Sequence, residues 1–353
     1  MKNSTLLILF LTALNGFSQL GGSRSYRFLD VPMTARAAGL GGNSMSIWGD
    51  DVNLIYSNPA LLNPSMDKQI SLNYCNYVGD LNFGYLAYAR NFKKDQGTFA
   101  ASMQFYNYGK FDGYDEFGQK TNTFNANDYS INLNYAKSMA DSMFNIGIAV
   151  KTIISQYDIY RSMGNAVDFG ITYHGSRNLT MSILAKNIGY MWKSYSNTSS
   201  KSEPLPVDVQ LGLSYKVAKA PFRLFLVYDN LLTRNLKYVN PLDTVGESNP
   251  FSSSTSKKDS SGWQKFRKRA GNRTDNFARH FTFGTEILLM KNFNLRIAYN
   301  YRRQKEMALP DRRGANGLSF GFSLRIKRFG FTYAFTKMAF PGNSNVFSLT
   351  TTL

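Results

Sequence analysis

Apolar and polar residues alternate along most of this 353-residue chain, and the alternation restricts the fold to one built from strands. In "DYSINLNYA", Tyr129, Ile131 and Leu133 fall on one face, whereas Ser130 and Asn132 fall on the other. Successive side chains of a strand point to opposite faces, so this pattern predicts a strand. Segments of this kind recur about fourteen times, beginning near residues 69, 81, 97, 127, 143, 165, 178, 206, 221, 277, 292, 316, 328 and 344.

The connections between these segments follow a second pattern. Every other connection is short, as in "KKDQ", "KSMADS", "HGSRN", "VAKA", "MKN" and "KR". Four of the intervening ones are long and cover residues 107–126, 190–205, 235–276 and 303–315. Short periplasmic turns and long extracellular loops, joined by an even number of strands, are typical of bacterial outer-membrane barrels. We therefore predict an all-β fold, a transmembrane antiparallel β-barrel. A soluble β-sandwich, which shows the same alternation within its strands, is the alternative.

Aromatic residues support the barrel. The chain contains 27 Phe, 22 Tyr and 3 Trp, although its mean hydropathy is only −0.31. Tyrosines cluster where predicted strands end, as in "NYCNYV", "QFYNYGKFDGY" and "IAYNYRR". Such clusters are typical of the aromatic girdles of membrane barrels. Ordinary core aromatics are the alternative interpretation.

Residues 1–18 have the features of a secretory signal peptide. Lys2 supplies a positive charge, and the apolar run that follows is too short to span a bilayer. Gly16 and Ser18 are the small residues expected before a cleavage site. We therefore expect export of the chain and, with the barrel pattern, location in the outer membrane. An N-terminal membrane-spanning helix is the alternative.

Residues 19–67 precede the barrel, which we place at residues 68–353, and we predict that they form a plug or lid segment. Their motif "RAAGLGGNSMSIWGDDVNLIYSNPALL" fits neither a dinucleotide fingerprint nor a phosphate-binding loop. Its glycines would allow close packing against the wall. The aspartates would cap a helix or pair with basic wall residues, and Asn-Pro would bend the chain toward the first strand. The residues assigned to this motif are Arg36, Gly39, Gly41, Gly42, Asp50, Asp51, Asn58 and Pro59.

The longest predicted loop, residues 235–276, has two parts. "PFSSSTSKKDSSG" is of low complexity, and "SGWQKFRKRAGNR" places two aromatic residues among basic ones. The second part is a candidate partner-docking loop or interfacial anchor, and a solvated surface loop is the alternative. The residues of this candidate are Trp263, Lys265, Phe266, Arg267, Lys268 and Arg269.

Charge and cysteine content exclude several classes of protein. The net charge is +18, but the basic residues are scattered and the chain is predicted to be exported. We therefore expect contact with outer-membrane lipid, lipopolysaccharide or acidic partners and no binding of nucleic acid. Cys75 is the only cysteine, which excludes an intramolecular disulfide and a cysteine-based metal site.

The sequence offers little for catalysis. His174 and His280 are the only histidines, and the strand map places them at opposite ends of the barrel. Asp168 and Glu286 fall on the face that points into the lumen, where carboxylates pair with Arg or Lys. Asn187 is expected at the end of a strand. We predict no catalytic residues, no metal site and no cofactor, and hence a protein that is not an enzyme.

Two resemblances add to these patterns. The segment "RAAGLGGNSMSIWGDDVNLIYSNPALL" resembles the N-terminal plug of the FadL-like superfamily of long-chain fatty acid transporters. That resemblance implies a fourteen-stranded barrel holding the segment inside, and a transporter of small hydrophobic molecules as the alternative function.

The second resemblance covers nearly the whole mature chain. "YRFLDVPMTARAAGLGGN", "FYNYGKFDGYDEFG", "EPLPVDVQLGLSYKVAKAPFR" and "YNYRRQKEMALPDRRGANGLSFGF" are similar to the PorQ-like family of the type IX secretion system of Bacteroidetes-type bacteria. This implies a barrel that anchors a cell-surface complex handling secreted cargo. The implied partners are a PorZ-like surface protein and PorU/PorV-like attachment machinery.

Overall fold

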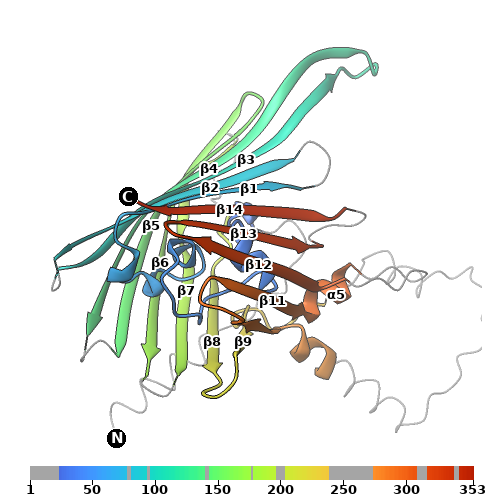
Figure 1. Cartoon of the computed structure of the whole chain (residues 1–353). Helices are drawn as coiled ribbons and strands as arrows, with labels where there is room; N and C mark the ends of the chain where they lie inside the picture. The colour runs from blue at the N-terminus through green and yellow to red at the C-terminus, as the bar shows by residue number, and fades with distance from the viewer. Residues whose placement is uncertain are drawn as a thin grey trace, which may run out of the picture.

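Fourteen antiparallel strands form one closed barrel in the computed structural model (Figure 1). Each strand pairs with its sequence neighbours, and β1 closes the barrel by pairing with β14, for example Leu72 with Leu349. The structure describes residues 24–77, 81–93, 96–139, 143–175, 178–195, 203–237, 273–307, 316–337 and 342–353.

The strands alternate in direction around the barrel. The first seven are β1 (Gln69–Asn76), β2 (Asn82–Lys93), β3 (Gly97–Tyr114), β4 (Lys120–Met139), β5 (Phe144–Tyr157), β6 (Tyr160–His174) and β7 (Leu179–Lys193). The remaining seven are β8 (Asp208–Lys216), β9 (Phe222–Tyr228), β10 (Phe281–Ile287), β11 (Phe293–Asn300), β12 (Leu318–Ile326), β13 (Phe329–Thr336) and β14 (Ser344–Thr352). A short helix, α5 (Tyr301–Glu306), follows β11.

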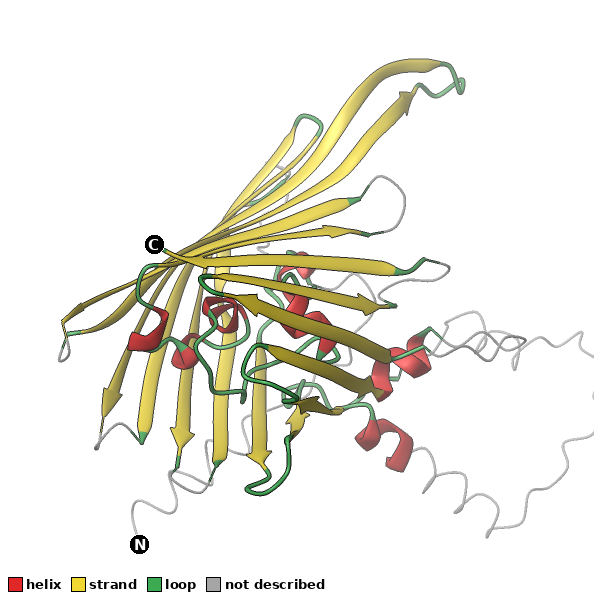
Figure 2. Cartoon of the chain, viewed as in Figure 1, coloured by secondary structure: helices red, strands yellow, loops and turns green. Residues whose placement is uncertain are grey.

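The predicted fold class and strand count are confirmed. The main correction concerns the region 107–126, which was predicted to be a loop. There β3 and β4 continue as a paired hairpin that projects beyond the other strands (Figure 2). The strand signal was missed because both faces of this hairpin are largely exposed, so apolar and polar residues no longer alternate.

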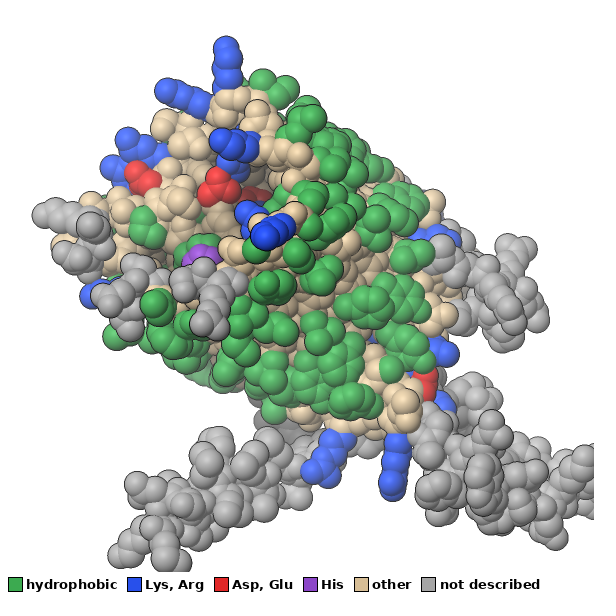
Figure 3. Space-filling model, turned by 60° about the horizontal axis from the view of Figure 1, so that its bottom comes forward, with side chains coloured by type: hydrophobic (Ala, Val, Ile, Leu, Met, Phe, Trp, Pro, Cys, Tyr) green, Lys and Arg blue, Asp and Glu red, His purple; other side chains and the backbone are tan. Residues whose placement is uncertain are grey.

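The wall has an apolar outside and a polar inside, as predicted. Ile131 and Leu133 are 49% and 63% exposed, whereas Ser130 and Asn132 between them are buried. Figure 3 shows hydrophobic side chains covering much of the wall. A soluble sandwich buries its apolar faces, whereas a membrane barrel presents them to lipid. The wall is therefore the lipid-facing surface of a transmembrane barrel. In the described part of the chain, no helix is long and apolar enough to span a membrane.

The two ends of the barrel differ. One end, called the turn end below, carries the short connections, such as those at 288–292 and 327–328. The other end, called the loop end, carries α5 and the connection 229–280 between β9 and β10. Within that connection the structure describes residues 229–237 and 273–280, so the candidate docking loop from Trp263 to Arg269 lies outside the described residues.

Residues 24–67, called the inner segment below, lie inside the barrel (Figures 1 and 2). The segment has one short α-helix and four 3₁₀ turns, namely η1 (Arg27–Asp30), α2 (Ala35–Gly39), η2 (Val52–Tyr56), η3 (Pro59–Leu61) and η4 (Pro64–Met66). Helix α2 contacts β11 to β14, and η3 contacts β4, β5 and β6 on another side of the lumen. The inner segment therefore bridges strands that lie far apart in the sequence.

Side-chain caps explain why so many short turns form. Thr34 accepts from the Ala37 backbone at the start of α2, and Asp51 accepts from Asn53 N at η2. Asn58 and Asn63 cap η3 and η4, each followed by proline at the first helical position. Asn, Asp and Thr favour capping, and proline suits a first turn because its missing N–H would be unpaired there.

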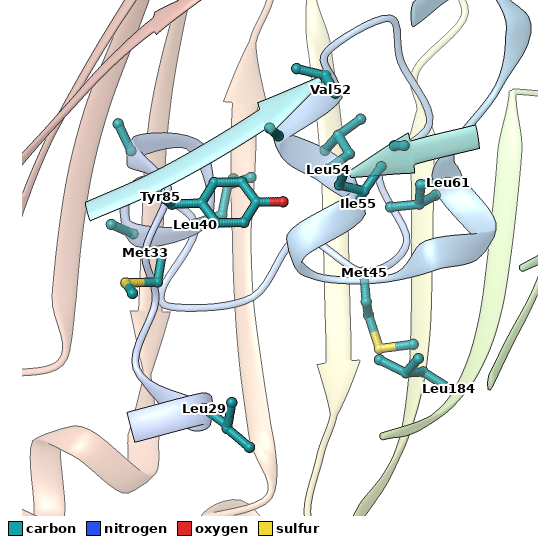
Figure 4. Close-up of a cluster of buried hydrophobic side chains, with 14 of the residues drawn as sticks. Leu29, Met33, Leu40, Met45, Val52, Leu54, Ile55, Leu61, Tyr85 and Leu184 are labelled. Carbon is teal, nitrogen blue, oxygen red and sulfur yellow. The ribbon is translucent and has the colours of Figure 1, made fainter. Parts of the chain in front are cut away.

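The core lies between the inner segment and the wall. Figure 4 shows Met33, Leu40 and Leu54 of the inner segment near Tyr85 of β2, and Met45 near Leu184 of β7. All five of the residues Met33, Leu40, Leu54, Met45 and Leu184 are fully buried. Burying a side chain of this size stabilises a protein by about 1.5–3 kcal/mol. The segment is thus held by apolar packing in its middle.

Candidate functional site

A cluster of four charged side chains joins the inner segment to the wall. The Glu286 carboxylate of β10 is fully buried. Its Oε1 lies 3.2 Å from Arg36 Nη2 and 2.8 Å from Arg296 Nε, and its Oε2 lies 2.8 Å from Arg223 Nη1. One carboxylate therefore pairs with three guanidinium groups, and among the described residues it connects α2 to β9, β10 and β11. The expected pairing of Glu286 with lumen arginines is confirmed.

The two aspartates of the motif have different partners. Asp50 Oδ2 accepts a hydrogen bond from Arg325 Nη1 of β12 at 2.6 Å, a contact half exposed at the turn end. This bond holds the pKa of the Asp50 carboxyl below its usual value. Asp51 Oδ2 instead lies 3.4 Å from Arg36 Nη1, within the inner segment, while its side chain caps η2. The expectation that the aspartates would cap a helix or pair with basic wall residues is confirmed, since Asp50 pairs with Arg325 and Asp51 caps η2.

The glycines of the motif lie against the wall. A Cβ atom on Gly39 would lie 3.3 Å from the Gly321 Cα of β12. Gly41 has a φ of 76°, and a Cβ there would lie 2.7 Å from Thr282 Cγ2. Gly42 has a φ of 106°, which side-chain-bearing residues rarely adopt. Gly39 and Gly41 let the backbone of the inner segment approach the strands closely, whereas Gly42 lies beside Pro32 and the Arg303 guanidinium of α5.

Asn58 anchors the inner segment to the wall. It is fully buried, and its Nδ2 donates to Met45 O at 3.0 Å and to Thr172 Oγ1 of β6 at 3.2 Å. Pro59 follows it at the start of η3. The chain passes through η3 and η4 before β1, so Asn58 and Pro59 start the return to the wall and do not lead directly into the strand.

Of the two predictions about Asp168 and Asn187 in the wall, one is confirmed and one is wrong. Asp168 Oδ2 lies 2.6 Å from Lys151 Nζ, which is the pairing expected for a lumen carboxylate. Asn187 was expected to end a strand and instead lies inside β7 at a bulge, with a φ of 57°. There its backbone N donates to Asp168 Oδ1 at 2.7 Å and its side chain accepts from Lys151. A left-handed residue that completes a buried network gives no local sequence signal, which explains the error.

The histidines do not form a catalytic group. His174 lies at the turn end, where its ring stacks on Trp48 with centroids 4.8 Å apart. His280 lies at the loop end, where its Nδ1 is 2.7 Å from Asp229 O. The two rings are at opposite ends of the barrel, as predicted. Among the described residues, no group of three or more His, Cys, Asp or Glu could hold a metal ion.

Polar cavities lie at both ends of the lumen, and two of them are called the turn-end cavity and the loop-end cavity below. The turn-end cavity has a volume of about 220 Å³ and is lined in part by Arg36, Asp50 and Arg296. The loop-end cavity has a volume of about 90 Å³ and is lined in part by Lys186 and Arg302. The packed middle of the inner segment lies between them.

Another hollow lies on the lipid-facing side of the wall and is called the outer groove below. It has a volume of about 410 Å³ and is formed by β2 to β5. Its lining is mainly apolar and aromatic, including Phe92, Phe99, Leu133 and Val150, with the small side chain of Ala101 among them. Its size and lining fit a small hydrophobic molecule or part of a lipid chain.

Comparisons with known proteins find a similar fold but no related sequence. No family model and no curated protein sequence matches the chain. The crystal structure of the Pseudomonas putida toluene transporter TodX aligns with a TM-score of 0.52 and 10% identity, covering 91% of this chain and 96% of that one. The monoaromatic hydrocarbon channel CymD aligns at 0.50 and 13%, covering 92% and 98%. A Pseudomonas aeruginosa FadL homologue aligns at 0.45 and 11%, covering 90% and 97%.

These likenesses show the fold alone, because the sequences are too different to show more. The likenesses to TodX and CymD agree with the predicted barrel fold. None of them supports the resemblance to the PorQ-like family, which stays a prediction. The chain is similar to TodX and CymD over nearly the whole length of both partners, as a closed barrel of fourteen strands.

Proposed function

We propose that this chain is an outer-membrane channel for a small hydrophobic molecule. The observation that carries the proposal is the whole-length likeness in fold to a toluene transporter and to a monoaromatic hydrocarbon channel. In this proposal the turn end faces the periplasm and the loop end faces the outside, as is usual for such barrels.

The outer groove supports a route for such a molecule. Its apolar lining lies on the lipid side, where hydrophobic molecules partition, and Asn134 and Ala100 of the inward-facing set also reach it. The lumen itself is filled by the inner segment, with polar contacts at both ends. Passage through the lumen therefore requires part of this segment to move, and the half-exposed Asp50–Arg325 contact is expected to be weaker than the buried Arg36–Glu286 pair.

Filling the outer groove tests the proposal. Ala101→Trp places a large side chain in the groove, and we expect it to lower the uptake of labelled toluene into vesicles containing the barrel by about tenfold, the effect of losing about 1.4 kcal/mol of binding. Leu213→Trp is the control, since Leu213 also faces lipid but lies on β8, away from the groove.

Two outcomes contradict the proposal. Vesicles with the unaltered barrel could take up toluene no faster than empty vesicles, which removes the channel function. Equal toluene uptake by the two tryptophan variants would instead show that the molecule does not pass through the outer groove.

A second candidate function is the anchoring role that the PorQ-like resemblance implies. The observation in its favour is the projecting β3–β4 hairpin, whose tip exposes Tyr114 by 63% and Phe117 by 80%. Phe111 and Phe124 stack across the hairpin with centroids 5.6 Å apart and stiffen it. Exposed aromatics on a rigid projection are suited to binding a protein partner.

Shortening the hairpin tests this second candidate. Replacing residues 110–125 with a two-residue turn is expected to abolish co-isolation of a PorZ-like surface protein from mildly solubilised outer membranes. The barrel should still insert and keep its heat-modifiable mobility on gels, because the removed pairs lie beyond the wall. Toluene uptake is the matched readout, since only the channel function should survive the change. Unchanged co-isolation, or no partner for the full chain, contradicts the anchoring role.

A further inference from the structure

The turn-end cavity carries more positive than negative charge. Five cationic side chains line it, namely Arg36, Arg223, Lys291, Arg296 and Arg325. Three carboxylates oppose them: Asp50 and Asp51 in the lining, and Glu286, which is bonded to three of the arginines. Five positive charges against three negative ones leave an excess of two positive charges around a space of about 220 Å³.

Three polar groups of the cavity lining lack partners in the described part of the chain, and one of them is Arg36 Nε. Arg296 is 3% exposed and uses its Nε for Glu286, but its Nη1 makes no hydrogen bond within the described part of the chain. The Ser323 hydroxyl of β12, also in the lining, is likewise buried without a partner there. A buried donor left unpaired destabilises the fold, because it has lost its hydrogen bonds to water without gaining another partner. Arg296 Nη1 and the Ser323 hydroxyl could each donate to an acceptor placed in the cavity.

We propose that this cavity binds a phosphate-type oxyanion. A phosphate group near neutral pH carries a charge of about −1.5 to −2, which balances the excess, and its oxygens accept several hydrogen bonds at once. Guanidinium groups match phosphate geometry through paired N–H donors. The proposal does not depend on the channel function, because it concerns the polar end of the lumen and not the apolar route.

Access to the site is from the turn end. Asp50 and Arg325 are about half exposed there, and Lys291 is exposed in the β10–β11 turn. The phosphate can thus come from the solution or from the headgroup of a lipid in the adjacent leaflet. Both sources present the same chemistry to the arginines, and the experiment separates them.

Calorimetric titration of the full-length barrel in a nonionic detergent at low ionic strength tests the site. Two probes are used, inorganic phosphate for the free source and dihexanoyl phosphatidic acid for the lipid source. Saturable binding of both, in competition, indicates a site open to either source, and binding of the lipid alone indicates a headgroup site. Binding of neither probe overturns the proposal.

Variants locate the binding. Arg296→Lys keeps the positive charge beside Glu286 but loses the unpaired Nη1, and we expect about tenfold weaker binding. Ser323→Ala removes only an unpartnered hydroxyl and Lys291→Gln only an exposed charge, so both should fold and weaken binding by about threefold to tenfold. Arg302→Lys, in the loop-end cavity, is the matched control with unchanged affinity. Equal affinity in all four variants would place the anion elsewhere and overturn the site.

Discussion

Glu286→Gln is expected to destabilise the folded barrel by about 3 kcal/mol. The substitution keeps the volume of the side chain but removes the one carboxylate that Arg36, Arg223 and Arg296 share. Removing one partner of a buried ion pair leaves charge uncompensated in a region of low dielectric constant, and here three guanidinium groups lose it together. Urea unfolding of the barrel in lipid vesicles, followed by gel mobility, measures the change.

Glu306→Gln is the matched control for this substitution. Glu306 lies in α5 at the loop end, half exposed, with its carboxylate 3.9 Å from Arg302 Nε. An exposed pair of this kind contributes at most about 0.5–1 kcal/mol, so Glu306→Gln should scarcely shift the unfolding midpoint. If both variants shifted the unfolding midpoint equally, the buried Glu286 cluster would contribute no more to stability than an exposed ion pair.

Gly147→Ala is expected to displace the inner segment from β5 and to cost about 1–3 kcal/mol. A Cβ atom at this position would lie 2.3 Å from the Ala60 backbone nitrogen and 2.3 Å from the Pro59 carbonyl carbon. Backbone atoms cannot rotate away as a side chain can, so η3 must move. We expect faster proteolysis between residues 57 and 62 and a lower unfolding midpoint, both measured on barrels in vesicles.

The control for this second prediction is Gly330→Ala. A Cβ on Gly330 would approach the Thr350 hydroxyl at 2.4 Å, and a hydroxyl can rotate to make room. This variant should leave the proteolysis of the inner segment unchanged. Protection of residues 57–62 in Gly147→Ala equal to that in the unaltered barrel would show that the contact between η3 and β5 is not tight.

The barrel wall was predictable from the sequence because its signals are local. The alternation of apolar and polar residues along each strand indicated which face each residue occupies. Together with the connections between the alternating segments, it indicated the number of strands. The prediction failed in the β3–β4 hairpin, where both faces of the strands are exposed to solvent. Apolar and polar residues do not need to alternate along such a strand.

The contacts of the inner segment were only partly predictable. The motif indicated close packing through Gly39 and Gly41, but no local pattern identifies the partners of Arg36, because Glu286 lies 250 residues away. The same limit explains Asp51, whose partner depends on how η2 is capped, and Asn187, whose left-handed backbone follows from a buried network. The partner of each of these side chains is set by the closed barrel and cannot be predicted from the neighbouring residues in the sequence.

The position of the inner segment also restricts the order in which the molecule can assemble. The segment is made first, yet α2 packs against β11 to β14, which are made last. Its apolar side chains therefore remain without their final neighbours until nearly the whole chain is available, and contacts at such long sequence separation form slowly. Closure of β14 onto β1 and enclosure of the segment must occur as late, coupled steps, so a chain that lost its last strands would expose its N-terminal core as well as an open sheet edge.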